Sequence, residues 1–275
     1  MNIIELCKCI ELDSATSRTV SEFEDNSEIQ QIVPHFKQLI SGLTAAETAS
    51  NVQSELEKNL SESRFSEINK NGIFMLYIHL KAACLSFEKY TEKDISFEIF
   101  KDTMKCFSRF VSEHVESFNK IGFDRAFWTY RQLSLQLFRI GELEYEIISP
   151  EESAIHIPSD ADISLDKCRA SFERYGKFLE KTFKMHPSRF SLDSWLISPA
   201  LDGLLEPSSK IIAFKNCFEL EEWNKDSADY KQWIFGKENI SIEEMPEKTS
   251  LQRKSKALLK SGGKIGTAKG YLKSF

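Results

Sequence analysis

Three side chains suited to proton transfer lie close together in the second half of the sequence. His156 stands in the short apolar run 154–157, and Asp160 and Asp162 follow just after Pro158. An ordinary imidazole has a pKa of about 6.5, so a histidine that a carboxylate orients is suited to act as a general base. Two other interpretations stay open: His156 satisfies the turn at Pro158 or a buried carbonyl, and the two aspartates cap the helix that follows.

A second set of candidates combines glycines with a lysine near the end of the sequence. Gly262, Gly263 and Gly266 surround Lys264. Flexible backbone N–H groups beside a lysine are suited to hold phosphate, so this segment is a candidate cofactor-binding site. It is not a Walker A loop, because the Gly-Lys-Ser/Thr ending is missing. The alternative is a helix that Gly262 closes, followed by a solvated basic end.

Composition limits the class of protein. The chain has 275 residues, of which 41% are hydrophobic and 28% charged, so we expect one or two globular domains. Six scattered cysteines form no CxxC pair and have no clustered histidines beside them, so we expect reduced thiols and no metal site. A net charge of −6 argues against broad nucleic-acid binding.

The sequence predicts neither membrane insertion nor secretion. The longest apolar stretch, 73–80, is far shorter than the roughly 20 residues of a membrane span, and it contains His79. Residues 1–5 lack the basic segment and apolar core of a secretory signal. We therefore expect a cytoplasmic protein that does not bind membranes.

The elements that position these candidates change in character along the chain. Up to residue 121 the pattern is helical, and its clearest helix follows the N-cap candidate Ser96, with apolar residues repeating every three or four positions as far as Phe118. We interpret this aromatic stripe as core packing. Other helices are expected at 3–10, 28–40, 44–60, 73–90 and 124–138.

Beyond Gly141 strands and helices are mixed. Strands are expected at 143–147, 154–157, 190–195 and 210–220, the last being the strongest candidate, and helices at 164–179, 199–205 and 250–259. Helices first and mixed elements afterwards predict an α+β protein. Its expected domains are an all-helical one at 1–121 and a mixed α/β one at 122–275, although the helix from Asp124 fits either side.

Five short segments of the second half occur in the order and spacing of a known family. They are GELEYE at 141–146, HIPSDAD at 156–162, DSWLISPAL at 193–201, IIAF at 211–214 and GGKIG at 262–266. On these segments the chain resembles a bacterial N-acyltransferase family with a helical N-terminal domain and a GNAT-like C-terminal domain.

The resemblance implies transfer of an acyl group from a coenzyme A thioester to an amine, with both substrates small molecules. In that chemistry His156 would be the general base, with Asp160 or Asp162 orienting it. Ser194 would donate to the oxyanion and Trp195 would wall the acyl pocket. The alternative for Trp195 is a plain core position. The segment 262–266 would hold the coenzyme phosphates, and no metal would take part.

One feature departs from the family pattern. GNAT enzymes usually hold the coenzyme pyrophosphate with a basic, glycine-containing turn after a central strand, whereas the turn 158–164 has no glycine and carries two carboxylates. Two alternatives therefore stay open. One is a non-catalytic GNAT-like binding or scaffolding protein, and the other binds an anionic partner through the lysines of 253–273. The sequence does not determine the oligomeric state.

Overall fold

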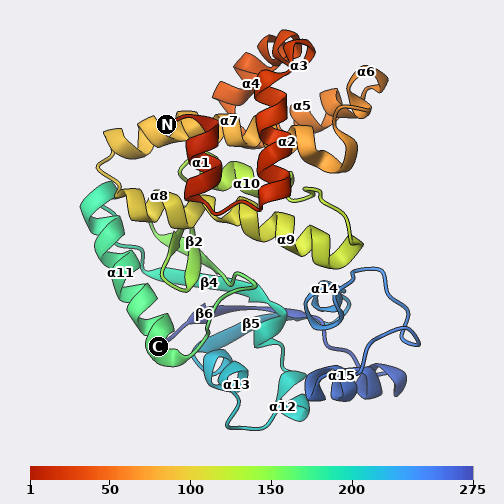
Figure 1. Cartoon of the computed structure of the whole chain (residues 1–275). Helices are drawn as coiled ribbons and strands as arrows, with labels where there is room; N and C mark the ends of the chain where they lie inside the picture. The colour runs from red at the N-terminus through yellow and green to blue at the C-terminus, as the bar shows by residue number, and fades with distance from the viewer. Residues whose placement is uncertain (275) are drawn as a thin grey trace. The chain divides into compact units, whose positions relative to one another are not determined.

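The computed structural model describes residues 1–274, which form two compact units (Figure 1). The first unit is Met1–Arg139 and the second begins at Ile140. This division falls later than the boundary expected near Gly122. The difference arises because α10 (Ala126–Leu133) packs against α5 (Ala49–Ser61) and α7 (Ile73–Glu92), and so belongs to the first unit.

Helices build the first unit as far as the start of β1 (Leu137–Ile140). Besides α5, α7 and α10 they are α1 (Ile3–Cys9), α2 (Ser14–Asp25), α3 (Ser27–Ile32), η1 (Val33–Phe36), α4 (Lys37–Gly42), α6 (Ser63–Ser66), η2 (Lys70–Gly72), α8 (Phe97–Met104) and α9 (Cys106–Phe118). The N-cap predicted at Ser96 is confirmed, since its side chain accepts from the Ile99 amide at 3.3 Å.

Several helix boundaries differ from expectation. The helix expected from Ser96 to Phe118 is divided at Lys105 into α8 and α9. The helix expected at 28–40 is divided around Pro34, where the 3-10 helix η1 separates α3 from α4. The next helix begins at Ala49, because Thr44 Oγ1 donates to the Ser41 carbonyl and belongs to the preceding turn. The helix expected at 124–138 ends at Leu133, since Leu135 adopts a left-handed φ of 59° before β1 begins.

The core of the first unit contains a fully buried histidine. On α7, His79 Nε2 lies 2.8 Å from Gln53 Oε1, and its Nδ1 lies 2.8 Å from Thr129 Oγ1. Burial lowers the pKa of His79 to about 3, so the ring is neutral at physiological pH. This polar network therefore links α5, α7 and α10 without placing a charge in the core.

The surroundings of the cysteine thiols do not favour the thiolate, which is the nucleophilic form. All six cysteines are thiols outside any disulfide, and burial raises the pKa of Cys7 to about 11 and that of Cys84 to about 12. Within residues 1–274 no three His, Cys, Asp or Glu side chains gather as potential metal ligands. No helix in this part of the chain is long and apolar enough to cross a membrane.

A six-stranded mixed sheet has the order β1-β2-β3-β4-β6-β5. Strands β2 to β6 belong to the second unit, and β1 ends at Ile140, the first residue of that unit. Strands β3 and β4 are parallel, whereas β2/β3, β4/β6 and β5/β6 are antiparallel. In chain order its elements are β2 (Leu143–Ile147), β3 (Glu152–His156), α11 (Leu165–Phe183), β4 (Arg189–Ser194), η3 (Trp195–Ile197), α12 (Leu201–Leu204), α13 (Lys210–Lys215), β5 (Phe218–Asn224), α14 (Tyr230–Phe235), α15 (Ser250–Lys260) and β6 (Thr267–Leu272).

Two strand predictions need correction. The segment 210–215, expected to begin the strongest strand, is the helix α13, because Ser209 caps it by accepting from the Ile211 amide. A short apolar run does not distinguish a buried helix from a strand. The strand β6 was not expected at all, although it lies inside the sheet between β4 and β5.

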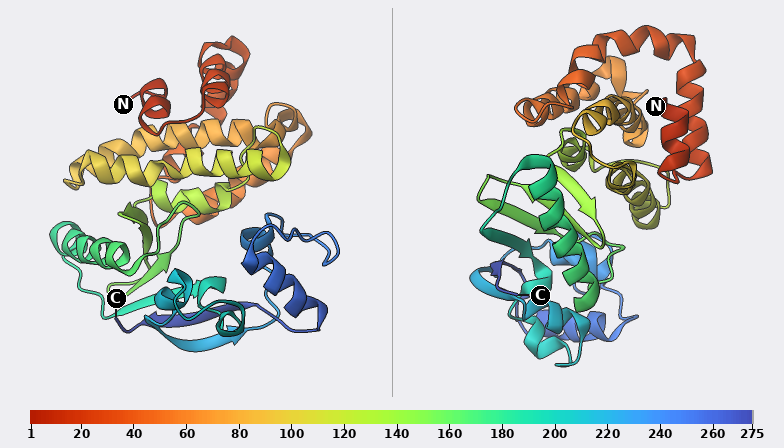
Figure 2. Two further views of the ribbon diagram at one scale, coloured as in Figure 1. Left: turned by 60° about the horizontal axis from the view of Figure 1, so that its bottom comes forward. Right: turned by 90° about the vertical axis from the view of Figure 1, so that its left-hand side faces the viewer.

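The two faces of the sheet differ in polarity. Helix α11 lies along one face, where Tyr145 and Tyr175 stack with ring centroids 4.0 Å apart (Figure 2). The register of β2, β3 and β4 places Glu146, His156 and Asp193 together on the opposite face. This second face carries the side chains capable of proton transfer.

Candidate active site

The predicted base, His156, is the last residue of β3. Its Nε2 lies 3.0 Å from Oε2 of Glu146, and both side chains are largely shielded from solvent. The antiparallel register explains this contact, because Glu146 faces Ala154 on β3 and so lies diagonally opposite His156. The carboxylate that orients the imidazole in these contacts is Glu146, which the sequence analysis did not single out.

Asp160 lies in the turn that follows β3. The Ala161 amide donates to the Pro158 carbonyl at 3.0 Å and closes this turn, in which Asp160 is exposed. Its predicted role in orienting His156 stays a prediction.

Asp162 is used at the beginning of α11. Its Oδ1 accepts from the Ser164 amide at 3.1 Å, and Ser164 is the N-cap residue of the helix. Lys167 Nζ lies 3.0 Å from Oδ2 and Lys210 Nζ lies 3.1 Å from Oδ1. Hydrogen bonds from these two lysines hold the pKa of Asp162 far below its ordinary value. These contacts agree with the helix-capping interpretation of Asp162.

The turn after β3 is less acidic in three dimensions than in sequence. Lys167 comes from α11 and Lys210 from α13, and together they neutralise Asp162. The Ser164 side chain makes no capping bond of its own, and the positive end of the dipole of the 19-residue helix α11 lies at this turn. The repulsion of a diphosphate expected from the sequence is therefore offset by two cations.

The parallel strands β3 and β4 pair over a short distance. Their register ends at Ala154 opposite Ser191, whereas β3 continues to His156 and β4 to Ser194. Beyond that point β3 pairs only with β2, and β4 only with β6. Backbone N–H and C=O groups on the two facing edges are thus left out of the β3–β4 ladder, beside the candidate base.

A second carboxyl group lies on the same face as His156. Asp193 on β4 has Lys269 of β6 as its Cα partner. Desolvation and, to a lesser extent, the charge of Asp229 raise the pKa of Asp193, and a hydrogen bond from Thr267 opposes this shift. Asp193 occurs in the segment DSWLISPAL, but only the register of the sheet shows that it shares a face with His156.

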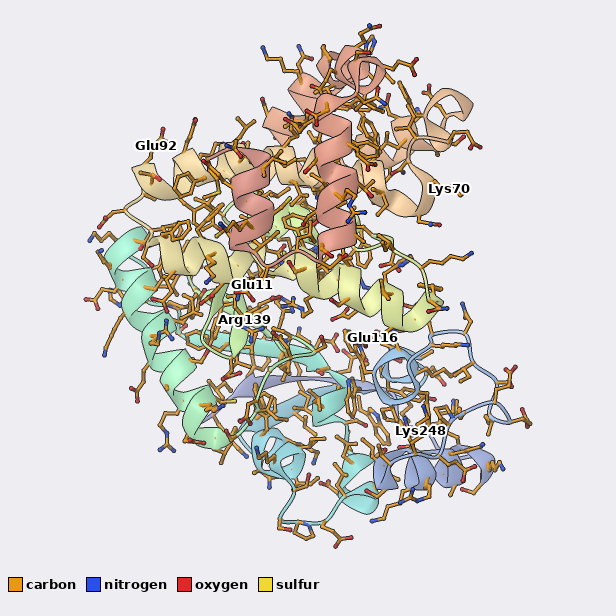
Figure 3. The ribbon with its side chains drawn as sticks, in the orientation of Figure 1. Glu11, Lys70, Glu92, Glu116, Arg139 and Lys248 are labelled. Atoms are coloured by element: carbon orange, nitrogen blue, oxygen red, sulfur yellow. The ribbon has the colours of Figure 1, made fainter. Side chains whose placement is uncertain are left out.

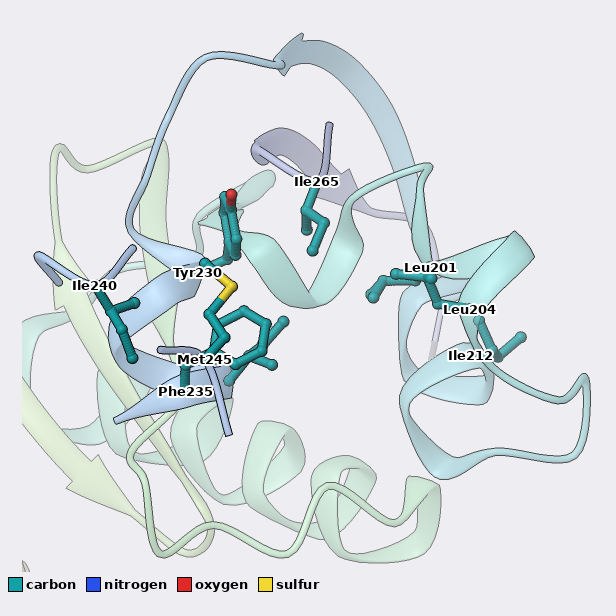
Figure 4. Packing of buried hydrophobic residues seen from close by; sticks show 9 residues of the cluster. Leu201, Leu204, Ile212, Tyr230, Phe235, Ile240, Met245 and Ile265 are labelled. Carbon is teal, nitrogen blue, oxygen red and sulfur yellow. The ribbon is translucent and has the colours of Figure 1, made fainter. Parts of the chain in front are cut away.

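The two predicted substrate-binding residues lie where β4 ends. Ser194 Oγ accepts from the Leu196 amide at 3.2 Å and thereby begins η3. Trp195 is half-buried and packs against an apolar cluster. Residues of this cluster are shown in Figure 4. The cluster consists of Leu201, Leu204, Ile212, Tyr230, Ile234, Phe235, Ile240, Met245 and Ile265.

The glycine-rich segment has structural tasks. Gly262 has a φ of 81° just after α15, and the Gly262 and Gly263 amides donate to the carbonyls of Leu259 and Leu258 at 3.1 and 2.9 Å. This pattern closes the helix, as the alternative interpretation held. Gly266 has a φ of 67° and lies against the Asn224 carbonyl. The predicted phosphate-binding role of this segment is not tested by these contacts.

Four of the seven lysines that follow Glu247 have ion pairs described here. Lys248 lies just before α15, and the others lie on this helix or after it (Figure 3). Their ion pairs are Lys254 with Glu206 at 3.1 Å, Lys256 with Glu247 at 2.9 Å, Lys264 with Asp226, and Lys269 with Glu221 at 3.2 Å. The charge asymmetry of the sequence is thus offset by acidic residues brought near in the fold.

The α+β fold and its polar sheet face are those of a GNAT-like protein, and comparison with known families agrees. Residues 1–135 match the N-acyltransferase N-terminal domain, and residues 137–272 match the GNAT-like C-terminal domain. The chain belongs to the family of N-acyltransferases in which these two domains are joined.

Solved structures of acyltransferases share this fold over the full length. One, in complex with decanoyl-CoA and teicoplanin, has a TM-score of 0.71 and 17% identity. Another, in complex with CoA and 10C-teicoplanin, has a TM-score of 0.71 and 16% identity. Each comparison covers 99% of both chains. A comparison with curated protein sequences finds no match.

Proposed function

We propose that the protein transfers an acyl group from a coenzyme A thioester to an amine, with His156 as general base and Glu146 as the carboxylate that orients it. The observation that carries the proposal is the 3.0 Å contact between His156 Nε2 and Glu146 Oε2 at the end of β3, beside the point where β3 and β4 stop pairing. Family membership and the acyl-CoA complexes of similar structures support it.

The His156–Glu146 pair can carry out the two proton transfers that amine acylation requires. When Nε2–H donates to Glu146, the second ring nitrogen carries the lone pair and can accept a proton. The amine nitrogen attacks the thioester carbonyl, and the proton that it loses passes to His156. Collapse of the tetrahedral intermediate breaks the carbon–sulfur bond, and His156 returns the proton to the leaving thiolate. Ser194 follows Asp193 on β4 and so points toward the opposite face of the sheet from His156. Its role as oxyanion donor therefore stays a prediction of the sequence and is not part of this proposal.

The surrounding residues fit a coenzyme A thioester. Beyond the end of the β3–β4 ladder, the facing edges of these strands present backbone N–H and C=O groups that can contact its amide-containing arm. The first amides of α11, flanked by Lys167 and Lys210, offer a site for its phosphates. We propose this site in preference to the segment 262–266, in which Lys264 pairs with Asp226.

Loss of one lysine at α11 is expected to weaken coenzyme A binding. A charge-assisted hydrogen bond contributes about 1.5–3 kcal/mol, so Lys167→Gln or Lys210→Gln should raise the Kd for coenzyme A about tenfold or more. Isothermal titration calorimetry measures this effect. The matched control is Lys264→Gln, which removes the same charge from the glycine-rich segment and should change the Kd less than about twofold.

Two other outcomes would contradict this assignment of the phosphate site. If Lys264→Gln weakens binding and the α11 variants do not, the phosphates bind at the glycine-rich segment. If the wild-type protein binds neither coenzyme A nor decanoyl-CoA, the acyl-transfer proposal fails and the scaffolding alternative is favoured. If the wild type binds either ligand, turnover is tested with decanoyl-CoA and a panel of primary amines that includes teicoplanin.

Trp195 is the proposed wall of the acyl site. It follows β4 directly and packs against the apolar cluster, so an aliphatic chain bound near Ser194 would contact it. Trp195→Ala should weaken decanoyl-CoA binding by about 1–3 kcal/mol and leave coenzyme A binding nearly unchanged. Calorimetry with both ligands checks this, with the exposed Trp233→Ala as control. An equal loss for the two ligands would contradict an acyl-binding role.

A further inference from the structure

A single carboxylate, that of Asp162, forms ion pairs with two lysines near the beginning of α11. Asp162 Oδ2 lies 3.0 Å from Lys167 Nζ and its Oδ1 lies 3.1 Å from Lys210 Nζ. The two lysines come from different helices, yet they meet on the two oxygens of a single anionic group. A phosphate at the same helix N-terminus would require the same donors, because it also presents anionic oxygens to them.

We propose that Asp162 is an internal competitor for the coenzyme phosphates: it holds Lys167 and Lys210 in the free protein and releases them when phosphate binds. This inference rests on the proposed coenzyme site at α11. It assigns Asp162 a regulatory role in place of the catalytic one expected from the sequence.

The contacts of Asp162 suit an exchange of partners. Its backbone amide donates to Glu142 Oε2 at 2.9 Å, so the position of the residue in the turn is fixed. Its side chain is 36% exposed, and the side chains of Lys167 and Lys210 are 49% and 66% exposed. Ion pairs this accessible to solvent are weak and break at little cost. The lysines can therefore turn from Asp162 to a ligand without movement of α11 or α13.

Glu142 adds to the same arrangement. Its Oε1 lies 3.6 Å from Lys167 Nζ, so Lys167 has a second acidic neighbour. Lys210 has Asp162 as its ion-pair partner in the described contacts. Removal of Asp162 alone should thus free Lys210 fully and Lys167 in part.

The test is the variant Asp162→Asn, which keeps an oxygen to accept from the Ser164 amide and removes the charge. If Asp162 competes, the variant should bind both coenzyme A and inorganic pyrophosphate about three- to tenfold more tightly than the wild type in calorimetric titrations. The matched control is Asp226→Asn, which frees Lys264 in the same unit and should leave both affinities unchanged. An unchanged or weaker affinity of Asp162→Asn overturns the proposal, since the carboxylate would then be neutral or would position the lysines.

Two further readouts separate competition from a general change of charge. In a Lys167→Gln/Lys210→Gln background, Asp162→Asn should no longer increase the affinity, and a persistent gain would contradict competition for these lysines. Affinity of the wild type should also fall less steeply with salt than that of Asp162→Asn, because salt weakens the competing ion pairs as well.

If neither protein binds coenzyme A, the proposed function fails together with this inference. If the wild type binds and the variant gains nothing, only the inference fails.

Discussion

Replacement of His156 by glutamine is expected to lower kcat for amine acylation by about 10²–10⁴-fold and to leave the Kd for coenzyme A within about twofold. The reason is that the proposed base would contact the reacting groups at the end of β3, whereas the proposed phosphate site lies at the beginning of α11. Steady-state kinetics with decanoyl-CoA and an amine that the wild type acylates measure the first quantity, and calorimetry measures the second.

Glu146→Gln provides the companion measurement. Glu146 acts through His156, with Nε2 and Oε2 3.0 Å apart, so its loss should reduce kcat less than loss of the histidine does. Full activity of His156→Gln would assign the base elsewhere, and Asp193 would then be the next residue to replace.

Gly266→Ala is expected to lower the free energy of unfolding of the second unit by about 3 kcal/mol or more. An added Cβ would lie 2.2 Å from the Asn224 carbonyl oxygen and 2.8 Å from Lys225 Cα, and the φ of 67° disfavours any residue with a side chain. Both neighbouring atoms belong to the backbone at the end of β5, so they cannot turn away as a side chain would. Urea denaturation followed by circular dichroism measures the loss.

The matched control is Gly262→Ala. Gly262 also has a positive φ, of 81°, but a Cβ there would meet nothing within 4 Å. Only the conformational cost of about 1 kcal/mol is expected. A Gly266→Ala protein of normal stability that no longer binds coenzyme A would instead support the phosphate-binding role predicted for this segment.

Local signals explain which elements were predictable from the sequence. Ser96 and the apolar residues after it define a helix start by contacts within a few residues, and α8 begins there. The break at Lys105, which divides the expected helix into α8 and α9, has no such signal. The alternating segment at 143–147 likewise forms β2. By contrast, the apolar run at 210–215 fits a helix and a strand equally well, and the capping contact of Ser209 decided between them.

The candidate site shows the same limit. A histidine near the end of a strand could be recognised in the sequence, but its carboxylate partner depends on the pairing of β2 with β3. Lys210 lies 48 positions from Asp162, so no local pattern connects these residues. Charges that look repulsive along the chain are therefore compensated by groups that only the fold brings near.

The place of β6 inside the sheet has a consequence for the order in which the second unit is completed. Strands β4 and β5 both pair with β6, and β5 has β6 as its neighbour in the sheet. During synthesis the ribosome releases β4 and β5 well before residues 267–272. Until then each strand has an edge without its β6 partner. The sheet of the second unit is thus completed by long-range strand pairing, which is a slow class of folding step. During that step β4 and β5 have exposed edges, and binding of a chaperone would protect them.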